Sequence, residues 1–193
     1  MNTNLAYQDD AWEKRREEII NGEVVMSPRP SWNHNQISSN IFRLFGNYLH
    51  GKKCTPIADG TDLYLDEKNR FVPDFMVVCD RSKIKWNGVH GDPDLVAEVL
   101  SPGTGMSDKR RKKDAYEKSG VPEYWIVDPA NRSIEVYLLE NGRYELDNIY
   151  TLYPSWELEA MTDEEKAALV TEFKCHLYDD LIIRLDDIFY DLL

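Results

Sequence analysis

Two acidic residues, Asp74 and Glu98, each stand inside an apolar stretch of the chain. Asp74 interrupts FVPDFMVV, and Glu98 is the one charged residue of LVAEVL, 24 residues later. A buried, ionised carboxylate is costly unless it is paired or binds a metal. Magnesium is held by one or two carboxylates with water and substrate phosphates, and it lowers the pKa of an attacking water. The two acids could therefore hold one cation such as Mg²⁺, which can polarise a phosphodiester.

A third chemical group comes from the segment SDKRRKKDAYEKSG (residues 107–120), which is typical of a helix that stops at Gly120. Asp108, Lys112 and Tyr116 are four residues apart and form one stripe on that helix. If the stripe faces the two acids, Lys112 could orient or deprotonate a water, or neutralise charge that grows on a phosphate.

The acids need strands to position them. The patterns predict a short strand around a turn at Asn21-Gly22 and a helix from Ser31 to Gly51. They then predict strands in TDLYLDE, RFVPDFMVVCD and DLVAEVLS, a loop in RSKIKWNGVHGDP, the helix at 107–118, and strands in PEYWIVDP and SIEVYLLE. This order is α-β-β-β-α-β-β, which indicates an α/β protein of the α+β type, with a mixed sheet and a crossover helix. In TDEEKAALVTEFK we expect an amphipathic helix, and in DDLIIRLDDIFYDLL a strand followed by a helical turn.

Alternation along the strands predicts how the acids are oriented. Asp74 should share its strand face with Val72, Met76 and Val78, and Glu98 should share its face with Val96 and Leu100. Adjacent strands lie about 4.8 Å apart, so the two carboxylates could converge on one cation.

The chain of 193 residues, 42% of them hydrophobic, is long enough for one domain with a proper core. We expect a single domain over residues 1–193, with a core at about 17–140 and a C-terminal extension at about 141–193. No apolar stretch reaches the roughly 20 residues of a membrane helix, and the N-terminus lacks the apolar core of a signal peptide. Cys54, Cys79 and Cys175 are far apart, which argues against a disulfide framework or a zinc cluster and favours buried filler. We therefore expect a cytoplasmic protein with no membrane association.

The net charge of −12 is concentrated in the last part of the chain, where residues 119–193 carry 5 basic and 17 acidic side chains. Residues 51–118 are almost balanced and hold the dense basic run KRRKK. Lys109, Arg110, Arg111 and Lys113 of this run are candidates for contacts to a nucleic-acid backbone, or they form a solvated charged surface. The acidic total disfavours a strong nonspecific DNA binder but leaves room for a local cationic site.

The order of these segments resembles the PD-(D/E)xK restriction-endonuclease-like superfamily. The strings PDFMVV, PDLVAEVLSP, SDKRRKKDAYEKSGVPEYWIVDP and LIIRLDDIF resemble the Uma-two family of restriction endonucleases, and the likeness runs from about Glu17 to Phe189. The resemblance implies a restriction-endonuclease-like core with an extra N-terminal strand, and an Mg²⁺- or Mn²⁺-dependent endonuclease acting on DNA as a homodimer.

Within that resemblance, Asp74 and Glu98 correspond to the metal-binding acids. The superfamily's usual lysine, two residues after the glutamate, is Leu100 in this chain, and Lys112 takes its place. Glu23, in NGEVV, is implied as a further acid of the pocket, and His34 matches a family histidine near the start of the first helix.

Plainer interpretations stand beside these. Asp74 could be a turn residue next to Pro73, Glu98 could form a buried ion pair with Lys112, and Lys112 could belong to a solvated basic face. At the level of function, the alternatives are a catalytically silent nuclease-fold protein that acts as a binding or interaction module, and an enzyme that cleaves RNA or a smaller phosphodiester.

Overall fold

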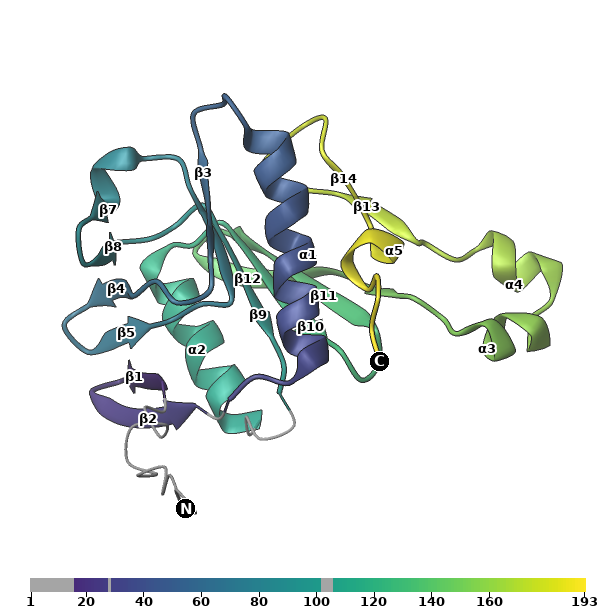
Figure 1. Cartoon of the computed structure of the whole chain (residues 1–193), viewed down its shortest axis with the longest axis horizontal. Helices are drawn as coiled ribbons and strands as arrows, with labels where there is room; N and C mark the ends of the chain where they lie inside the picture. Colours follow the sequence, from purple (N-terminus) through teal and green to yellow (C-terminus); the bar gives the residue numbers. More distant parts are fainter. Residues whose placement is uncertain (1–15, 28, 102–105) are drawn as a thin grey trace, which may run out of the picture.

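The computed structural model describes residues 16–27, 29–101 and 106–193, with only the backbone described for Arg16, Ser27 and residues 106–109. Its centre is a mixed sheet in the strand order β12 (Arg143–Thr151), β11 (Ser133–Glu140), β10 (Glu123–Asp128), β9 (Leu95–Val99), β6 (Phe75–Val78) and β3 (Thr55–Ala58). Strands β9 and β10 are parallel, and the helix α2 (Met106–Ser119) connects them, while the other neighbours are antiparallel. The predicted mixed sheet with a crossover helix is confirmed (Figure 1).

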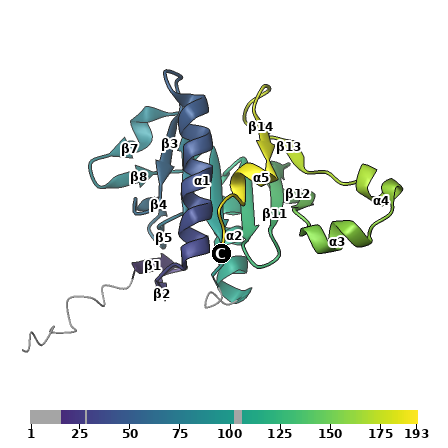
Figure 2. The same cartoon turned by 45° about the vertical axis from the view of Figure 1, so that its right-hand side comes forward.

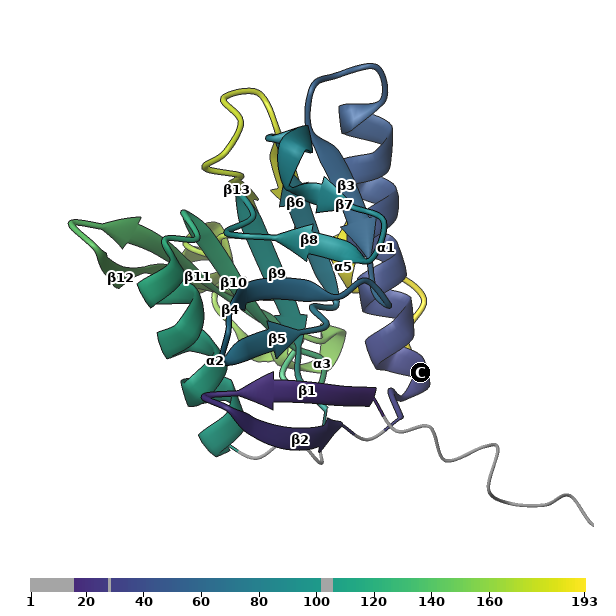
Figure 3. The same ribbon diagram turned by 90° about the vertical axis from the view of Figure 1, so that its left-hand side faces the viewer.

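A second sheet has the order β2 (Glu23–Ser27), β1 (Arg16–Ile20), β5 (Asn69–Phe71), β4 (Leu63–Asp66), β8 (Gly88–His90) and β7 (Ile84–Lys85). Figure 3 shows this sheet in front of the central one, with α2 on one side and α1 (Trp32–Leu49) on the other. The hairpin β1–β2 turns at Asn21-Gly22, where both residues have positive φ, as a tight turn between antiparallel strands requires.

Each face of the central sheet has its own apolar core. On one face, Ile41 and Phe45 of α1 pack with Phe75 and Trp125 of the sheet. On the other face a second cluster joins the second sheet, α2 and the central sheet, and its members include Ile20, Phe71, Met76, Val96, Tyr116 and Ile126. The predicted helix stripe therefore faces a core through Tyr116, although α2 has few apolar residues.

The C-terminal part returns to α1. The helices α3 (Ser155–Ala160) and α4 (Asp163–Ala167) project away from the central sheet (Figure 2). They are followed by the strands β13 (Glu172–Lys174) and β14 (Ile182–Arg184) and the helix α5 (Leu185–Ile188). Asn40 of α1 donates two hydrogen bonds, 3.0 Å to the Ile188 carbonyl and 2.9 Å to the Tyr190 carbonyl, which hold this end in place. The predicted strand and helical turn in DDLIIRLDDIFYDLL are confirmed, whereas only a short part of TDEEKAALVTEFK is helical.

Several local expectations are wrong. The segment RFVPDFMVVCD forms two strands, β5 and β6, in different sheets, because Pro73 has no N–H to continue a ladder and the chain crosses from one sheet to the other. The expected loop at RSKIKWNGVHGDP contains a 3₁₀ turn (Arg81–Lys83) and the hairpin β7–β8. Strands β3 and β12 were not predicted.

The cysteine expectation is also wrong in part, because Cys54 and Cys79 form a disulfide. Thr55 of β3 pairs with Val78 of β6, so the next residues along, Cys54 and Cys79, meet across the two strands despite their separation of 25 residues. Cys175 is free and buried, as expected for a small apolar filler. Among the residues that the structure describes, no helix has both the length and the apolar character needed to cross a membrane.

Candidate active site

The two predicted acids meet on the face of the central sheet that α2 covers. Phe75 of β6 pairs with Ala97 of β9, and continuing this antiparallel register by one residue sets Asp74 opposite Glu98. Side chains opposite one another on neighbouring strands have Cβ atoms about 4.5–5.5 Å apart. Both carboxylates are buried. The backbone N–H of Val99 donates a 2.7 Å hydrogen bond to Asp74 Oδ2, so Asp74 is held against the strand that carries Glu98.

Lys112 of α2 reaches into this pair. Its Nζ lies 3.1 Å from Glu98 Oε2, and Tyr116, one helical turn further along, donates a 2.6 Å hydrogen bond to Glu98 Oε1. The predicted stripe of Lys112 and Tyr116 therefore faces Glu98. The side chains of Asp108 and Lys109, which were also candidates, lie outside the described residues.

An acid that the sequence reasoning missed completes the cluster. Glu18 of β1 is 2% exposed, accepts a 2.9 Å hydrogen bond from the Val72 N–H, and lies with its Oε1 2.8 Å from Lys112 Nζ. A signal for it exists in REEII, because strand alternation puts Glu18 on the same face as Ile20, which is fully buried.

Glu23, predicted as the further acid of the pocket, is not in the cluster. It lies just after the hairpin turn on the outer edge strand β2, its side chain is 74% exposed, and Arg111 Nη1 donates a 2.9 Å hydrogen bond to its Oε2. Strand β1 lies between β2 and β5. Glu18 of β1 therefore occupies the position in the cluster that was expected for Glu23 of β2.

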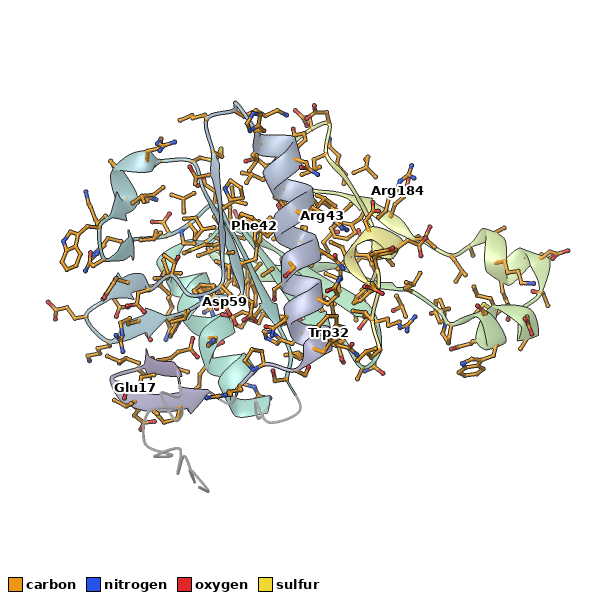
Figure 4. The ribbon with its side chains drawn as sticks, viewed as in Figure 1. Glu17, Trp32, Phe42, Arg43, Asp59 and Arg184 are labelled. Atoms are coloured by element: carbon orange, nitrogen blue, oxygen red, sulfur yellow. A yellow bond between two sulfur atoms is a disulfide. The ribbon has the colours of Figure 1, made fainter. Side chains whose placement is uncertain are left out.

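His34 also contacts Asp74, with its Nε2 3.1 Å from Asp74 Oδ2. It stands in the first turn of α1, where Ser31 caps the helix by accepting from the His34 N–H. The other ring nitrogen, Nδ1, is buried and has no hydrogen-bond partner among the described residues. Burial alone would lower the pKa of His34, but the hydrogen bond and charge of Asp74, together with the charges of Asp59 (labelled in Figure 4) and Glu98, raise it above the ordinary value.

The electrostatics of the cluster follow from three carboxylates gathered around one ammonium group. Burial raises the pKa of Glu98 to about 7, and the charges of Asp74 and Glu18 add to the rise, while Lys112 and Tyr116 oppose it. Burial would lower the pKa of Lys112, but Glu98 and Glu18 outweigh it and raise that pKa. Lys112 therefore stays protonated near neutral pH, where it can donate hydrogen bonds but cannot accept a proton.

The donor set can be compared with what a metal requires. The described residues contain no group of three or more His, Cys, Asp or Glu side chains arranged to hold an ion. Asp74 and Glu98 offer two hard oxygen ligands on one face, and Mg²⁺ usually keeps several waters beside one or two carboxylates. The acid pair and the excess of negative charge around it thus fit an ion of this type.

The other basic residues of α2 have separate contacts. Arg111 binds Glu23, Lys113 Nζ lies 3.5 Å from the centre of the Tyr137 ring, and Arg110 is exposed. None of these three is among the contacts of Asp74 or Glu98 described above. Their proposed role in binding nucleic acid stays a prediction.

A mixed sheet with two acids on neighbouring strands, and a crossover helix that brings a lysine to one of them, defines a restriction-endonuclease-like α/β protein. The crystal structure of a "putative nuclease belonging to DUF820" from Anabaena variabilis shares the fold, with a TM-score of 0.64 at 19% identity over 91% of this chain and 90% of that chain. The chain belongs to the Uma2 family, whose model is described as "Putative restriction endonuclease" and matches residues 6–168. An uncharacterized protein of Synechocystis sp., sll1609, is 29% identical over 137 residues, which cover 69% of this chain and 76% of that protein.

Proposed function

We propose that this protein is an Mg²⁺- or Mn²⁺-dependent endonuclease that hydrolyses phosphodiester bonds of DNA. The observation that carries the proposal is the placement of Asp74 and Glu98 opposite one another on β6 and β9, with Lys112 bound to Glu98. Membership of a family described as restriction endonucleases supports DNA as the substrate. Cutting both strands of a duplex suits a homodimer, which we propose as the working assembly.

Each residue has a distinct part in this chemistry. Asp74 and Glu98 would hold the ion, which when bound would polarise the phosphodiester and lower the pKa of an attacking water. Lys112, kept protonated by its two acids, would donate to that water or to the negative charge that grows on the phosphate.

The surrounding groups orient these three. Glu18 anchors the Lys112 ammonium from β1, and Tyr116 fixes one oxygen of Glu98. His34 and the Val99 N–H both contact Oδ2 of Asp74, which limits how that carboxylate can turn. A metal-binding carboxylate held in this way needs little reorganisation when substrate arrives.

The test is hydrolysis of labelled duplex DNA, with single-stranded DNA and RNA in parallel, in Mg²⁺, in Mn²⁺ and in a chelator. We expect activity that the chelator abolishes, and a loss of about 100-fold or more in Asp74→Asn and in Glu98→Gln. Glu23→Gln is the matched control, because it neutralises an exposed carboxylate outside the cluster and should keep the activity of the unaltered protein.

Three outcomes contradict the proposal in different ways. Hydrolysis of RNA alone would replace the substrate and keep the site. Equal activity in Asp74→Asn, Glu98→Gln and Glu23→Gln would remove the site. Binding of DNA without hydrolysis in either metal would identify a catalytically silent binding protein, in which Lys112 and Glu98 form a structural ion pair.

A further inference from the structure

The hairpin β7–β8, at the edge of the second sheet opposite to β2, presents a tryptophan to the solvent. Trp86 is the first residue of its two-residue turn and is 97% exposed. Indole groups bury a large apolar area when they can, so an almost completely exposed one is unusual. Exposure alone does not assign a partner, because Trp156 of α3 is also 72% exposed. The surroundings of the two residues distinguish them.

The base of the hairpin is firmly fixed in the fold. Val89 of β8 is fully buried in the core beneath the second sheet, and its N–H donates a 2.8 Å hydrogen bond to the Asp62 carbonyl. Gly88 packs so closely that a Cβ at this position would lie 2.3 Å from the same carbonyl oxygen, and its φ of +142° also disfavours other residues. A hairpin anchored in this way holds Trp86 outward at a set position, which lowers the entropy cost of binding through it.

The hairpin that carries Trp86 has basic residues and no acidic one. Residues 81–91 contain Arg81, Lys83 and Lys85, and the acidic residues Asp80 and Asp92 flank this segment. Lys83 is paired with Asp92 at 3.2 Å, while Arg81 and Lys85 are exposed. An exposed aromatic ring beside cationic side chains is the combination that binds nucleic acid, because the ring stacks on bases and the cations contact phosphates.

Trp156 has the opposite setting. Its neighbours Glu157 and Glu159 belong to the same short helix, in the part of the chain where acidic residues dominate. Figure 1 shows α3 and the β7–β8 hairpin at opposite ends of the molecule. A phosphate group would be repelled by the glutamates beside Trp156 and attracted by Arg81 and Lys85 beside Trp86.

The distance from the hairpin to the candidate active site suits one stretch of duplex. Glu18 lies on β1, and the sheet order β1-β5-β4-β8-β7 puts β7 four strands away. At about 4.8 Å per strand this is about 19 Å, or roughly six base pairs at about 3.4 Å each. A DNA strand that continues from the site by this length would reach the hairpin.

We propose that the β7–β8 hairpin is a DNA-binding element in which the Trp86 ring stacks on an unpaired base and Lys85 and Arg81 contact the phosphate backbone. The inference rests on the proposed function, since it names a second contact surface for the same substrate. The element lies apart from the acid pair, so it would contribute affinity and orientation without touching the reacting atoms.

The experiment measures binding of a fluorescently labelled duplex with a single-stranded overhang by anisotropy, in a chelator so that no cleavage occurs. Trp86→Ala should weaken binding about tenfold, because one stacked base is worth a factor of this order, and Trp86→Phe should keep most of the affinity. Lys85→Ala should lower the slope of log affinity against log salt by about 0.9, the amount for one phosphate contact. Trp156→Ala is the matched control and should bind like the unaltered protein.

The outcomes separate this inference from the proposed function. If the unaltered protein binds DNA and Trp86→Ala binds as tightly as Trp156→Ala, the inference is overturned and the nuclease proposal stands. If the unaltered protein binds no DNA in the chelator, the inference is overturned, and the hydrolysis test in Mg²⁺ and Mn²⁺ decides the nuclease proposal separately. If Trp86→Ala instead changes the mass of the protein in solution, measured by light scattering, Trp86 lies between two copies of the chain and the inference is wrong.

Discussion

Glu98 and Glu123 are both buried glutamates on neighbouring parallel strands, yet they have opposite surroundings. In the register of β9 with β10, Glu98 pairs with Ile126 and Glu123 pairs with Leu95, so the two acids lie near opposite ends of the same strand pair. Glu98 faces α2 and the second sheet with Val96, whereas Glu123 shares its face with Trp125 in the core under α1.

The partners of Glu123 are all neutral donors. Its Oε1 accepts from Trp125 Nε1 at 2.8 Å, and its Oε2 accepts from the Leu177 N–H at 3.0 Å and from Cys175 Sγ at 3.6 Å. Burial raises the pKa of Glu123, and these hydrogen bonds oppose the rise. The carboxylate thereby ties the C-terminal segment around Cys175 to the central sheet.

Glu98 has charged neighbours of both signs. Lys112 and Tyr116 donate to it, but Asp74 and Glu18 place two further negative charges close by. Burial raises the pKa of both glutamates, so burial does not separate them. The difference is the excess of negative charge around Glu98, which a bound cation would relieve and which Glu123 lacks. This comparison teaches that the neighbours of a buried acid identify a candidate site better than its burial does.

The largest effect should come from removing Lys112, the cation that contacts Glu98 and not Glu123. Lys112→Met leaves Glu98 and Glu18 buried without their shared partner, which typically costs about 3–5 kcal/mol. We expect a loss of this size in the free energy of unfolding in urea at pH 8. The double variant Lys112→Met/Glu98→Gln should recover part of it, because the second change removes one uncompensated charge. A loss below about 1 kcal/mol would show that the ammonium does not neutralise these acids.

The matching change on Glu123 should lower the stability of the protein and leave its rate of hydrolysis nearly unchanged. Glu123→Ala leaves the Trp125 indole N–H and the Leu177 N–H buried without an acceptor, at about 1–3 kcal/mol in the free energy of unfolding. Hydrolysis by the folded variant should stay within about threefold of the unaltered protein, in contrast to the 100-fold loss expected in Glu98→Gln. If Glu123→Ala loses activity as Glu98→Gln does while it stays folded, the distinction between the two acids is wrong.

Local patterns were sufficient to predict the parts of the site that share one element. The four-residue spacing of Lys112 and Tyr116 on a helix, and the alternation that sends Met76 and Val96 to the α2 face, both hold in the structure. These features depend on helix and strand periodicity alone. From this periodicity, Asp74, Glu98 and Lys112 were predicted to lie close together, and they do so in the structure.

The failures depend on which strands become neighbours. Glu18 and Glu23 stand on either side of one hairpin turn and, because Ile20 pairs with Glu23, on the same face of the hairpin. The pairing of β1, and not β2, with β5 places Glu18 in the cluster and leaves Glu23 on the outer strand. Cys54 and Cys79 meet because β3 adds to β6, a strand that sequence reasoning had merged with β5. Pairings between distant segments follow from tertiary packing, which short-range periodicity does not contain.

A smaller effect should appear in the pH dependence of stability. The pKa of Glu123 is higher in the folded than in the unfolded protein, so the folded state keeps this proton up to a higher pH. Its stabilising contribution is complete below the unfolded pKa of about 4.3 and is lost as pH rises through the folded pKa. The free energy of unfolding should therefore fall with rising pH by at most about 1.4 kcal/mol per unit from this group, and Glu123→Gln should remove that slope. Equal slopes in both proteins, measured by urea unfolding from pH 4 to 8, would contradict the assignment.

The smallest effect should come from the exposed end of the β1–β2 hairpin. Glu23→Gln breaks an ion pair with Arg111 whose glutamate is 74% exposed, and such pairs contribute about 0–1 kcal/mol. Glu18→Gln, five residues earlier, keeps an oxygen for the Val72 N–H but removes a buried charge that faces Lys112, so its loss in the free energy of unfolding should be clearly larger. Thermal unfolding of the two variants side by side tests this order. If Glu23→Gln is the more destabilised variant, Glu23 and not Glu18 is the acid of the hairpin that completes the cluster.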